Sequence, residues 1–166
     1  LIEAGLQPVL LDNFINSSPK VVDRIEQLTG VRLELIDMDV LNTAGVTEAL
    51  QTHNIHGVIH FAALKAVGES VVKPLAYYHN NVTGLMSVLQ AMHDAKVQHI
   101  VLSSSATVYG ENTPVPYKEG GSLSATSPYG ESKVMMEHIT RDVARAEPSL
   151  RYAMLRYFNP VGAHPS

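Results

Sequence analysis

The chain of 166 residues is predicted to be a single α/β domain built on a doubly wound parallel sheet. Short apolar runs, such as Val9–Asp12 and Gly57–Phe61, have the length of buried strands. Segments with apolar residues at helical spacing separate these runs, so strand and helix patterns alternate along the chain. Because parallel strands need a crossover connection, this alternation is typical of a parallel sheet with helices on its faces.

Bulk composition narrows the classes of partner and compartment. Hydrophobic residues make up 45% of the chain, which is enough for a core. The net charge is −4 and there is no long basic run, so neither nucleic acid nor an anionic membrane surface is an expected partner. The sequence has no cysteine and no apolar run of membrane-spanning length. We therefore expect a soluble, cytoplasmic protein.

Glycines and apolar spacing mark the elements of the first half. Leu1–Leu6 has the pattern of the last turn of a helix, with Gly5 at its C-cap. Val22 and its neighbours at helical spacing predict a helix that ends at Gly30. The predicted order for this half is a helix end at 1–6, a strand at 9–12, a helix at 21–28, a strand at 33–40, a short helix at 46–50 and a strand at 57–61.

A long helix is predicted over residues 74–95, because apolar residues recur along one stripe. The stripe consists of Leu75, Tyr78, Val82, Leu85, Val88, Leu89 and Met92, and its tyrosine and methionine are expected to pack in the core.

The second half contains a short apolar run, Gln98–Leu102, that predicts a buried strand leading into three serines. Glu111–Thr126 is rich in Pro, Gly, Ser and Thr and is predicted to be a loop at the rim of a functional site. Pro128 has the place of a first helical residue, so a helix is expected over 129–146. A last strand is predicted over 150–155.

Tyr129 and Lys133 carry the clearest chemical signal. They are four residues apart, so their side chains share one face of the predicted helix. A phenol with its ordinary pKa of ~10 is a poor base, but a neighbouring ammonium and a helix N-terminus both favour the phenolate. Ser105, at the end of the preceding strand, could then hold a substrate hydroxyl. The five-residue motif alone also occurs by chance in surface helices; the serine strand and the helix start favour the catalytic interpretation.

These motifs resemble the UDP-glucose 4-epimerase family, in the extended branch of the short-chain dehydrogenase/reductase superfamily. Four segments carry the resemblance: SSSATVYG at 103–110, SPYGESK at 127–133, LRYFNPVGA at 155–163 and HFAALKAVGES at 60–70. The family has a Rossmann-like domain with a Gly-x-Gly-x-x-Gly loop, which this sequence does not contain. The resemblance implies that residues 1–166 are a partial NAD-binding domain, with a first strand and glycine loop before residue 1 and most of a substrate domain after residue 166. We expect this piece alone to be inactive.

NAD is the expected cofactor. Asp12 lies at a strand end, where an acid accepts hydrogen bonds from the adenosine ribose, and no arginine follows that would bind a 2′-phosphate of NADP. Asp12 could instead simply begin a turn, and Asp39–Val40 could be a turn or cap at a strand end. Lys65 could be a solvated surface lysine, and Asn80 could be a helix cap or solvated. The resemblance implies that the cofactor contacts Asp12, Asn13, Phe14, Ile15, Asn16, Ser17, Asp39, Val40, Phe61, Ala62, Ala63, Leu64, Lys65, Asn80, Ser105, Tyr129, Lys133 and Phe158.

The resemblance also implies an activity: NAD-dependent interconversion of UDP-glucose and UDP-galactose by oxidation and re-reduction at C4 of the sugar. Tyr129 would be the base, Lys133 would support it and bind the nicotinamide ribose, and Ser105 would bind the 4-oxygen. The UDP-sugar would contact Lys65, Ser105, Tyr129 and Asn159.

Alternative functions are another extended reductase that acts on a sugar nucleotide, such as a UDP-glucuronate epimerase or a dehydratase, or a non-catalytic dinucleotide-binding fragment. A dehydratase would need an acid pair near the serine, and Ala106–Val108 offers none.

Two further expectations concern metals and assembly. His53, His56 and His60 are close in sequence but span a helix end, a turn and a strand, so no metal site is expected. By resemblance, the helices at 74–95 and 129–146 would form a four-helix homodimer interface in the full-length protein.

Overall fold

The computed structural model describes residues 1–111 and 113–162. The strands are β1 (Val9–Asp12), β2 (Glu34–Asp37), β3 (Val58–His60), β4 (His99–Ser105) and β5 (Arg151–Tyr157). The α-helices are α1 (Lys20–Thr29), α2 (Thr43–Thr52), α3 (Val67–Val72), α4 (Pro74–Tyr77), α5 (Gly84–Ala95) and α6 (Pro128–Ala146). Short 3₁₀-helices are η1 (Ile2–Ala4) and η3 (Ala106–Tyr109), and η2 (Tyr78–Thr83) is a π-helix.

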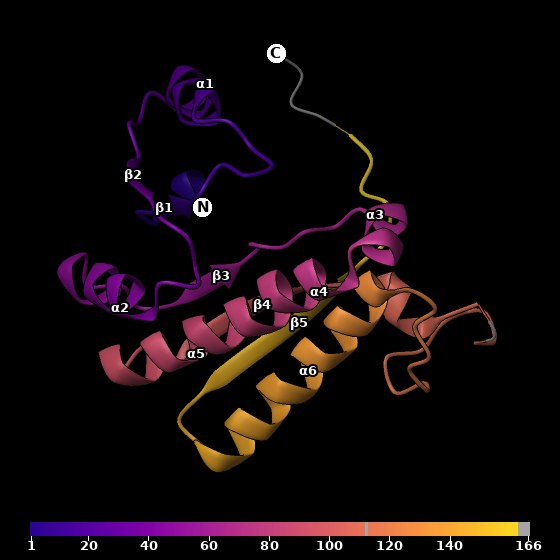
Figure 1. Ribbon diagram of the computed structural model, residues 1–166. Coiled ribbons are helices and arrows are strands. Elements are labelled where there is room, and N and C mark those ends of the chain that lie inside the picture. Colours follow the sequence, from indigo (N-terminus) through magenta and orange to yellow (C-terminus); the bar gives the residue numbers. More distant parts are fainter. Residues whose placement is uncertain (112, 163–166) are drawn as a thin grey trace.

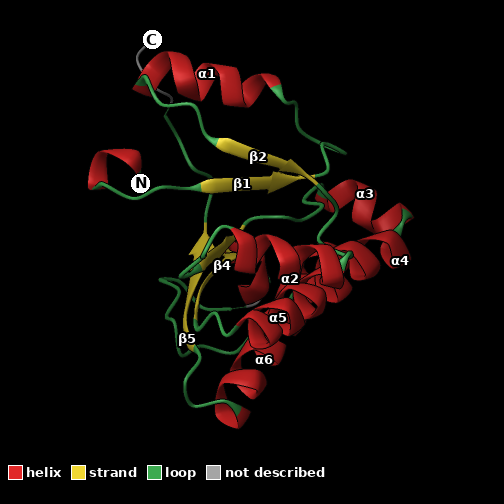
Figure 2. Cartoon of the chain, turned by 90° about the vertical axis from the view of Figure 1, so that its left-hand side faces the viewer, coloured by secondary structure: helices red, strands yellow, loops and turns green. Residues whose placement is uncertain are grey.

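The strands are parallel and form two hydrogen-bonded sets, β1–β2 and β3–β4–β5, with β4 in the centre of the second set. The predicted α/β class with parallel strands and helical crossovers is confirmed. Within the described residues β1 and β3 are not neighbours in a ladder, so the strands do not form one continuous sheet. Figure 2 shows the β1–β2 pair apart from β4 and β5, with α1 on one side of the pair and α2 on the other.

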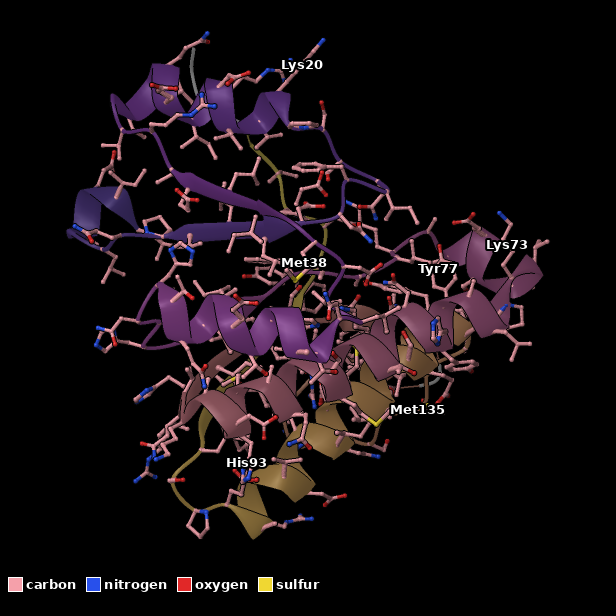
Figure 3. The ribbon with its side chains drawn as sticks, turned by 60° about the vertical axis from the view of Figure 1, so that its left-hand side comes forward. Lys20, Met38, Lys73, Tyr77, His93 and Met135 are labelled. Carbon is pink, nitrogen blue, oxygen red and sulfur yellow. The ribbon has the colours of Figure 1, made fainter. Side chains whose placement is uncertain are left out.

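The main core lies between the β3–β4–β5 set and helices α2, α5 and α6. Leu85 of α5, Leu102 of β4 and Met136 of α6 are fully buried in it. Figure 1 shows α5 and α6 lying over β4 and β5. Met38 lies between β1 and α2 (Figure 3) and joins the β1–β2 pair to the same core. This core fixes the direction of β3 and β4, whose carboxyl ends carry the predicted site residues 61–65 and Ser105.

Local signals at Gly5, Gly30 and Ser127–Pro128 correctly marked helix ends, whereas the helix predicted at 46–50 extends from Thr43 to Thr52. Gly5 and Gly30 have φ of 76° and 71°, the left-handed conformation that closes a helix. Ser127 caps α6 by accepting a hydrogen bond from the Gly130 N–H, with Pro128 as the first helical residue. The strand predicted at 33–40 is shorter, and the three serines belong to β4 instead of following it.

The predicted long helix over 74–95 is wrong, because η2 separates α4 from α5. A π-helical turn holds more residues than an α-helical one, so it shifts the phase of the apolar stripe. Leu75 is consequently 82% exposed, and the fully buried tyrosine is Tyr77 instead of Tyr78. Helix α3 had no sequence prediction. No helix in the described part of the chain is long and apolar enough to cross a membrane.

Candidate active site

A compact loop follows β1 and is folded around the Asp12 carboxylate. Asp12 Oδ1 accepts hydrogen bonds from the Phe14 N–H at 2.7 Å and from the Ser17 hydroxyl at 2.9 Å. Phe14 adopts a left-handed conformation with φ of 55°, and Ile15 N–H donates to Asn13 Oδ1 at 3.1 Å. Both recorded bonds of Asp12 use one oxygen, which leaves Oδ2 to accept from a ligand.

Hydrogen bonds join this loop to the ends of β2 and β3. Asn13 Nδ2 donates to Asp39 Oδ2 at 2.8 Å, and Asn16 Nδ2 donates to the Ala63 carbonyl at 3.2 Å. Asp39 also accepts from the Leu41 N–H at 2.9 Å. The structure thus brings together the residues predicted at 12–17, at 39–40 and at 61–65. The Val40 side chain is the exception, because it packs against the main core.

Asn81 fixes the segment after β3, and the sequence did not reveal this. Its Oδ1 accepts from the Leu64 N–H at 2.8 Å and its Nδ2 donates to the Leu64 carbonyl at 2.9 Å and to Ser132 Oγ at 3.0 Å. The predicted Asn80 is half-buried and donates to Asn81 Oδ1 at 3.0 Å. The amide of Asn81 is fully buried in η2, so this π-helix is where α6 is joined to the strand-end loop.

The side chains of the segment after β3 differ in exposure. Ala62, Ala63 and Leu64 are half-buried, whereas Lys65 is exposed and its side chain is directed to solvent or to a ligand. Phe61 is 62% exposed, and its ring centroid is 6.4 Å from that of Tyr157. The fully buried Tyr77 accepts a hydrogen bond from the Ala66 N–H and donates to Glu69. These contacts add to those of Asn81 and Asn16 in holding the segment that contains the small side chains of Ala62 and Ala63.

The three serines at the end of β4 each have a different partner. Ser103 uses its carbonyl oxygen, which accepts a hydrogen bond from Lys133 Nζ at 2.8 Å. Ser104 donates to Glu137 Oε1 at 2.6 Å. Ser105 Oγ accepts from the Thr107 N–H at 3.3 Å and from the Thr107 hydroxyl at 3.0 Å. Since a hydroxyl has two acceptor lone pairs and one donor, Ser105 retains its proton to donate to a substrate oxygen.

Tyr129 is half-buried in the first turn of α6, where the positive end of the helix dipole favours an anion. Lys133 Nζ lies 6.0 Å from the centroid of the Tyr129 ring, so the two side chains share one face of α6, as predicted. The Lys133 side chain is only 3% exposed, and this burial lowers its pKa to about 8.

His60 is a buried neighbour of this lysine. It is 4% exposed and its Nε2 has no hydrogen-bond partner among the described residues. Burial, and then the charge of Lys133, lower the pKa of His60 to about 3. The imidazole is therefore neutral, and it adds no second positive charge beside the ammonium.

Aromatic rings from separate segments line the outer rim. Tyr109 and Tyr117 are stacked with centroids 4.7 Å apart, and Tyr117 is stacked on Phe158 at 6.0 Å. Phe158 is 62% exposed and Asn159 beside it is also exposed, so both reach a ligand only from the rim. The end of the motif at Ala163 lies outside the described residues. Among the residues described, no three His, Asp or Glu side chains are grouped as metal ligands.

The arrangement therefore combines a helix-borne tyrosine, a buried ammonium, a serine donor and polar strand ends at one edge. The model of the NAD dependent epimerase/dehydratase family matches residues 1–166. The chain belongs to this family. Membership in the NAD dependent epimerase/dehydratase family confirms the resemblance that the motifs predicted.

Named relatives within the family narrow the comparison. The chain is 52% identical over 167 residues to the UDP-glucose 4-epimerase of Yersinia pestis, a match that covers 100% of this chain and 49% of the relative. It therefore spans about half the length of the curated relatives it matches.

Solved structures agree with this result. The UDP-glucose-4-epimerase of Stenotrophomonas maltophila, solved with bound NAD and formylated UDP-arabinopyranose, has a TM-score of 0.96 and 43% identity, over 99% of this chain and 49% of that one. The Bifidobacterium longum UDP-glucose 4-epimerase, solved in complex with NAD+ and UDP, has a TM-score of 0.95 and 46% identity, over 99% and 49% of the two chains.

The buried ammonium of Lys133 predicts a pH-dependent stability in the full-length gene product without cofactor. The pKa of Lys133 is about 8 in the folded protein, below its ordinary 10.5. Between these values the unfolded chain binds more protons, so this residue's contribution to stability should rise with pH from about 8 to 10.5. The total change should be about 3 kcal/mol.

Denaturant unfolding of the parent and of Lys133→Met at several pH values between 7 and 10.5 measures this effect. The parent should gain stability relative to the variant as the pH rises. If the difference in unfolding free energy between the parent and Lys133→Met stays constant across this range, the lowered pKa of Lys133 is contradicted.

Proposed function

We propose that the protein containing this chain is a UDP-glucose 4-epimerase that interconverts UDP-glucose and UDP-galactose, with NAD as its cofactor. The observation that carries the proposal is the joint placement of Tyr129, Lys133 and Ser105 at the edge where β1, β2 and β3 also end. The solved relatives support it, one with bound NAD and formylated UDP-arabinopyranose and one with NAD+ and UDP. The proposal places residues 1–166 in the NAD-binding domain and, since the sequence has no cysteine, the protein in the cytoplasm.

The residues at the strand ends fit NAD. Asp12 has an oxygen left for ribose hydroxyls, and the 13–17 loop and Asp39 border the adenosine side by their mutual hydrogen bonds. The proposed contacts of the cofactor are Asp12, Asn13, Phe14, Ile15, Asn16, Ser17, Asp39, the Val40 backbone, Phe61, Ala62, Ala63, Leu64, Lys65, Asn80, Ser105, Tyr129, Lys133 and Phe158. When bound, NAD supplies an acceptor for hydride from C4 of the sugar and returns that hydride to the same carbon.

Three side chains of this chain, those of Tyr129, Lys133 and Ser105, have different roles in moving the proton of the sugar's 4-hydroxyl. Tyr129 as phenolate takes the proton from the 4-hydroxyl of the sugar and later gives it back. The Lys133 ammonium and the N-terminus of α6 favour that phenolate electrostatically. Ser105 donates a hydrogen bond to the 4-oxygen in both directions of the reaction and keeps its proton, because its lone pairs already accept from Thr107. Lys65 and Asn159, both exposed at the edge of the site, are the proposed contacts for the remainder of the UDP-sugar.

The helical face formed by α4, η2 and α6 is proposed to bind a second copy of the chain. An open groove of about 440 Å³ lies on this face, lined by Leu75, Tyr78, His79, Val82, Thr83 and Met135. Leu75 is 82% exposed and Met135 on α6 (Figure 3) is 41% exposed, so the groove is an apolar surface. Pairing two such faces about a two-fold axis buries both and closes the assembly as a dimer.

Replacing the base is the direct test of the reaction. In the full-length gene product Tyr129→Phe should lower turnover of UDP-galactose by about 10²- to 10⁴-fold, because the proton acceptor is lost. NAD content should stay at the parent level, since the phenol is not part of the fold's core. Turnover close to that of the parent would show that Tyr129 is not the base.

A charge in the groove is the test of the dimer. Leu75→Glu and Met135→Glu should each convert the dimer into a monomer, because two carboxylates would be buried face to face. Val31→Glu is the control, since Val31 is also 41% exposed but lies between α1 and β2. Light scattering coupled to gel filtration measures the mass; a monomeric parent, or a dimer that tolerates both groove variants, would contradict the proposed interface.

A further inference from the structure

A buried ion-pair cluster lies behind the site and is not used by the chemistry described above. Glu137 of α6 is fully buried, and its carboxylate accepts hydrogen bonds from Arg156 Nε at 2.9 Å and Arg156 Nη2 at 2.8 Å. Ser104 and Arg141 bind the same carboxylate at 2.6 Å and 2.7 Å. Burial alone would raise the pKa of Glu137, but the hydrogen bonds from Arg156 and Ser104 lower it, so the carboxylate is ionised.

Arg156 has a second set of contacts, which involve Tyr109 and Glu119 instead of Glu137. Its Nη1 donates to the Tyr109 hydroxyl at 3.0 Å and to the Glu119 carbonyl at 2.9 Å. Its guanidinium carbon lies 4.9 Å from the centroid of the Tyr109 ring. One side chain of β5 therefore joins α6 to the predicted rim loop, Glu111–Thr126. Lysine could not reproduce this, because it lacks the planar fork of donors.

The loop that Arg156 holds lies beside the catalytic tyrosine. Tyr117 of the loop is stacked between Tyr109 and the exposed Phe158. At its other end, Ala125 is packed against Gly130, next to Tyr129: a Cβ added at Gly130 would lie 2.9 Å from the Ala125 Cβ. The loop therefore contacts the aromatic rim through Tyr117 and the start of α6 through Ala125.

We propose that Arg156 is a positioning residue, which anchors the 113–126 part of the loop to buried Glu137 and so holds the aromatic rim in the form that binds the sugar nucleotide. Loss of this anchor leaves the base and its ammonium in place, because neither touches Arg156. The expected consequence is weaker binding of the substrate with little change in the chemical step. The consequence for substrate binding rests on the proposed epimerase function; the anchoring of the loop does not.

Arg156→Lys and Arg141→Lys are matched variants for the test in the full-length gene product. Both keep a positive charge next to Glu137 and lose the guanidinium, but only Arg156 contacts the loop. Cleavage by a glutamate-specific protease reports on the loop, because the Glu119 carbonyl that Arg156 holds belongs to the Glu119–Gly120 peptide bond. Neither substitution adds or removes a glutamate.

Arg156→Lys should raise the rate of cleavage at Glu119 at least about fivefold and raise KM for UDP-galactose about as much, with kcat within about threefold of the parent. Arg141→Lys should leave both quantities near the parent values. If Arg156→Lys does not fold, Tyr109→Phe replaces it: this variant keeps the stacked ring, loses one acceptor of Arg156 and should raise cleavage at Glu119 by a smaller factor.

Equal cleavage of Arg156→Lys and the parent would overturn the proposal. Equal increases in the two lysine variants would also overturn it, because they would assign the effect to the lost guanidinium hydrogen bonds to Glu137 instead of to the loop contact. The protease assay needs no substrate. If the parent has no epimerase activity but Arg156→Lys is still cleaved faster than the parent, the anchoring role of Arg156 stands and the proposed function is rejected.

Discussion

The buried ammonium of Lys133 is the constraint around which the site is arranged. A charged amine that is 3% exposed must be held by polar atoms, and the structure supplies the carbonyl oxygen of Ser103. That hydrogen bond fixes α6 against the end of β4, and with it the position of Tyr129 one helical turn earlier. The neighbouring His60 is neutral because its own burial, and then the charge of Lys133, lower its pKa.

Each attachment between strand ends and helices places a different part of the site. Asn81 binds both backbone groups of Leu64 and so positions the segment after β3, while Glu137 binds Ser104 and so positions the serine strand from behind. The Asp12 loop is held separately, through Asp39 and Ala63. The carboxyl ends of parallel strands meet at one edge of the sheet. The hydrogen bonds named above fix the positions of the polar groups at that edge.

What the sequence predicted was local. Gly5, Gly30 and the Ser127–Pro128 pair act on adjacent residues, and the spacing of Tyr129 and Lys133 needs only a helix, so all of these were predictable. Long-range partners were not: Asn81 and Leu64 are 17 residues apart, and Glu137 and Arg156 are 19 apart, with nothing in the sequence to pair them. The buried Asn81 lies in the π-helix η2, and the apolar stripe that predicted an unbroken helix contains no signal for either feature.

In the proposed reaction the intact protein oxidises and re-reduces one carbon of the sugar without net loss of hydride. The measurement is the conversion of UDP-galactose that carries deuterium at C4, with the full-length gene product and NAD. The UDP-glucose formed should keep the deuterium at C4, with no stoichiometric build-up of NADH. Loss of the label to water would instead indicate proton abstraction from carbon, and NADH that accumulates with each turnover would indicate a net dehydrogenase.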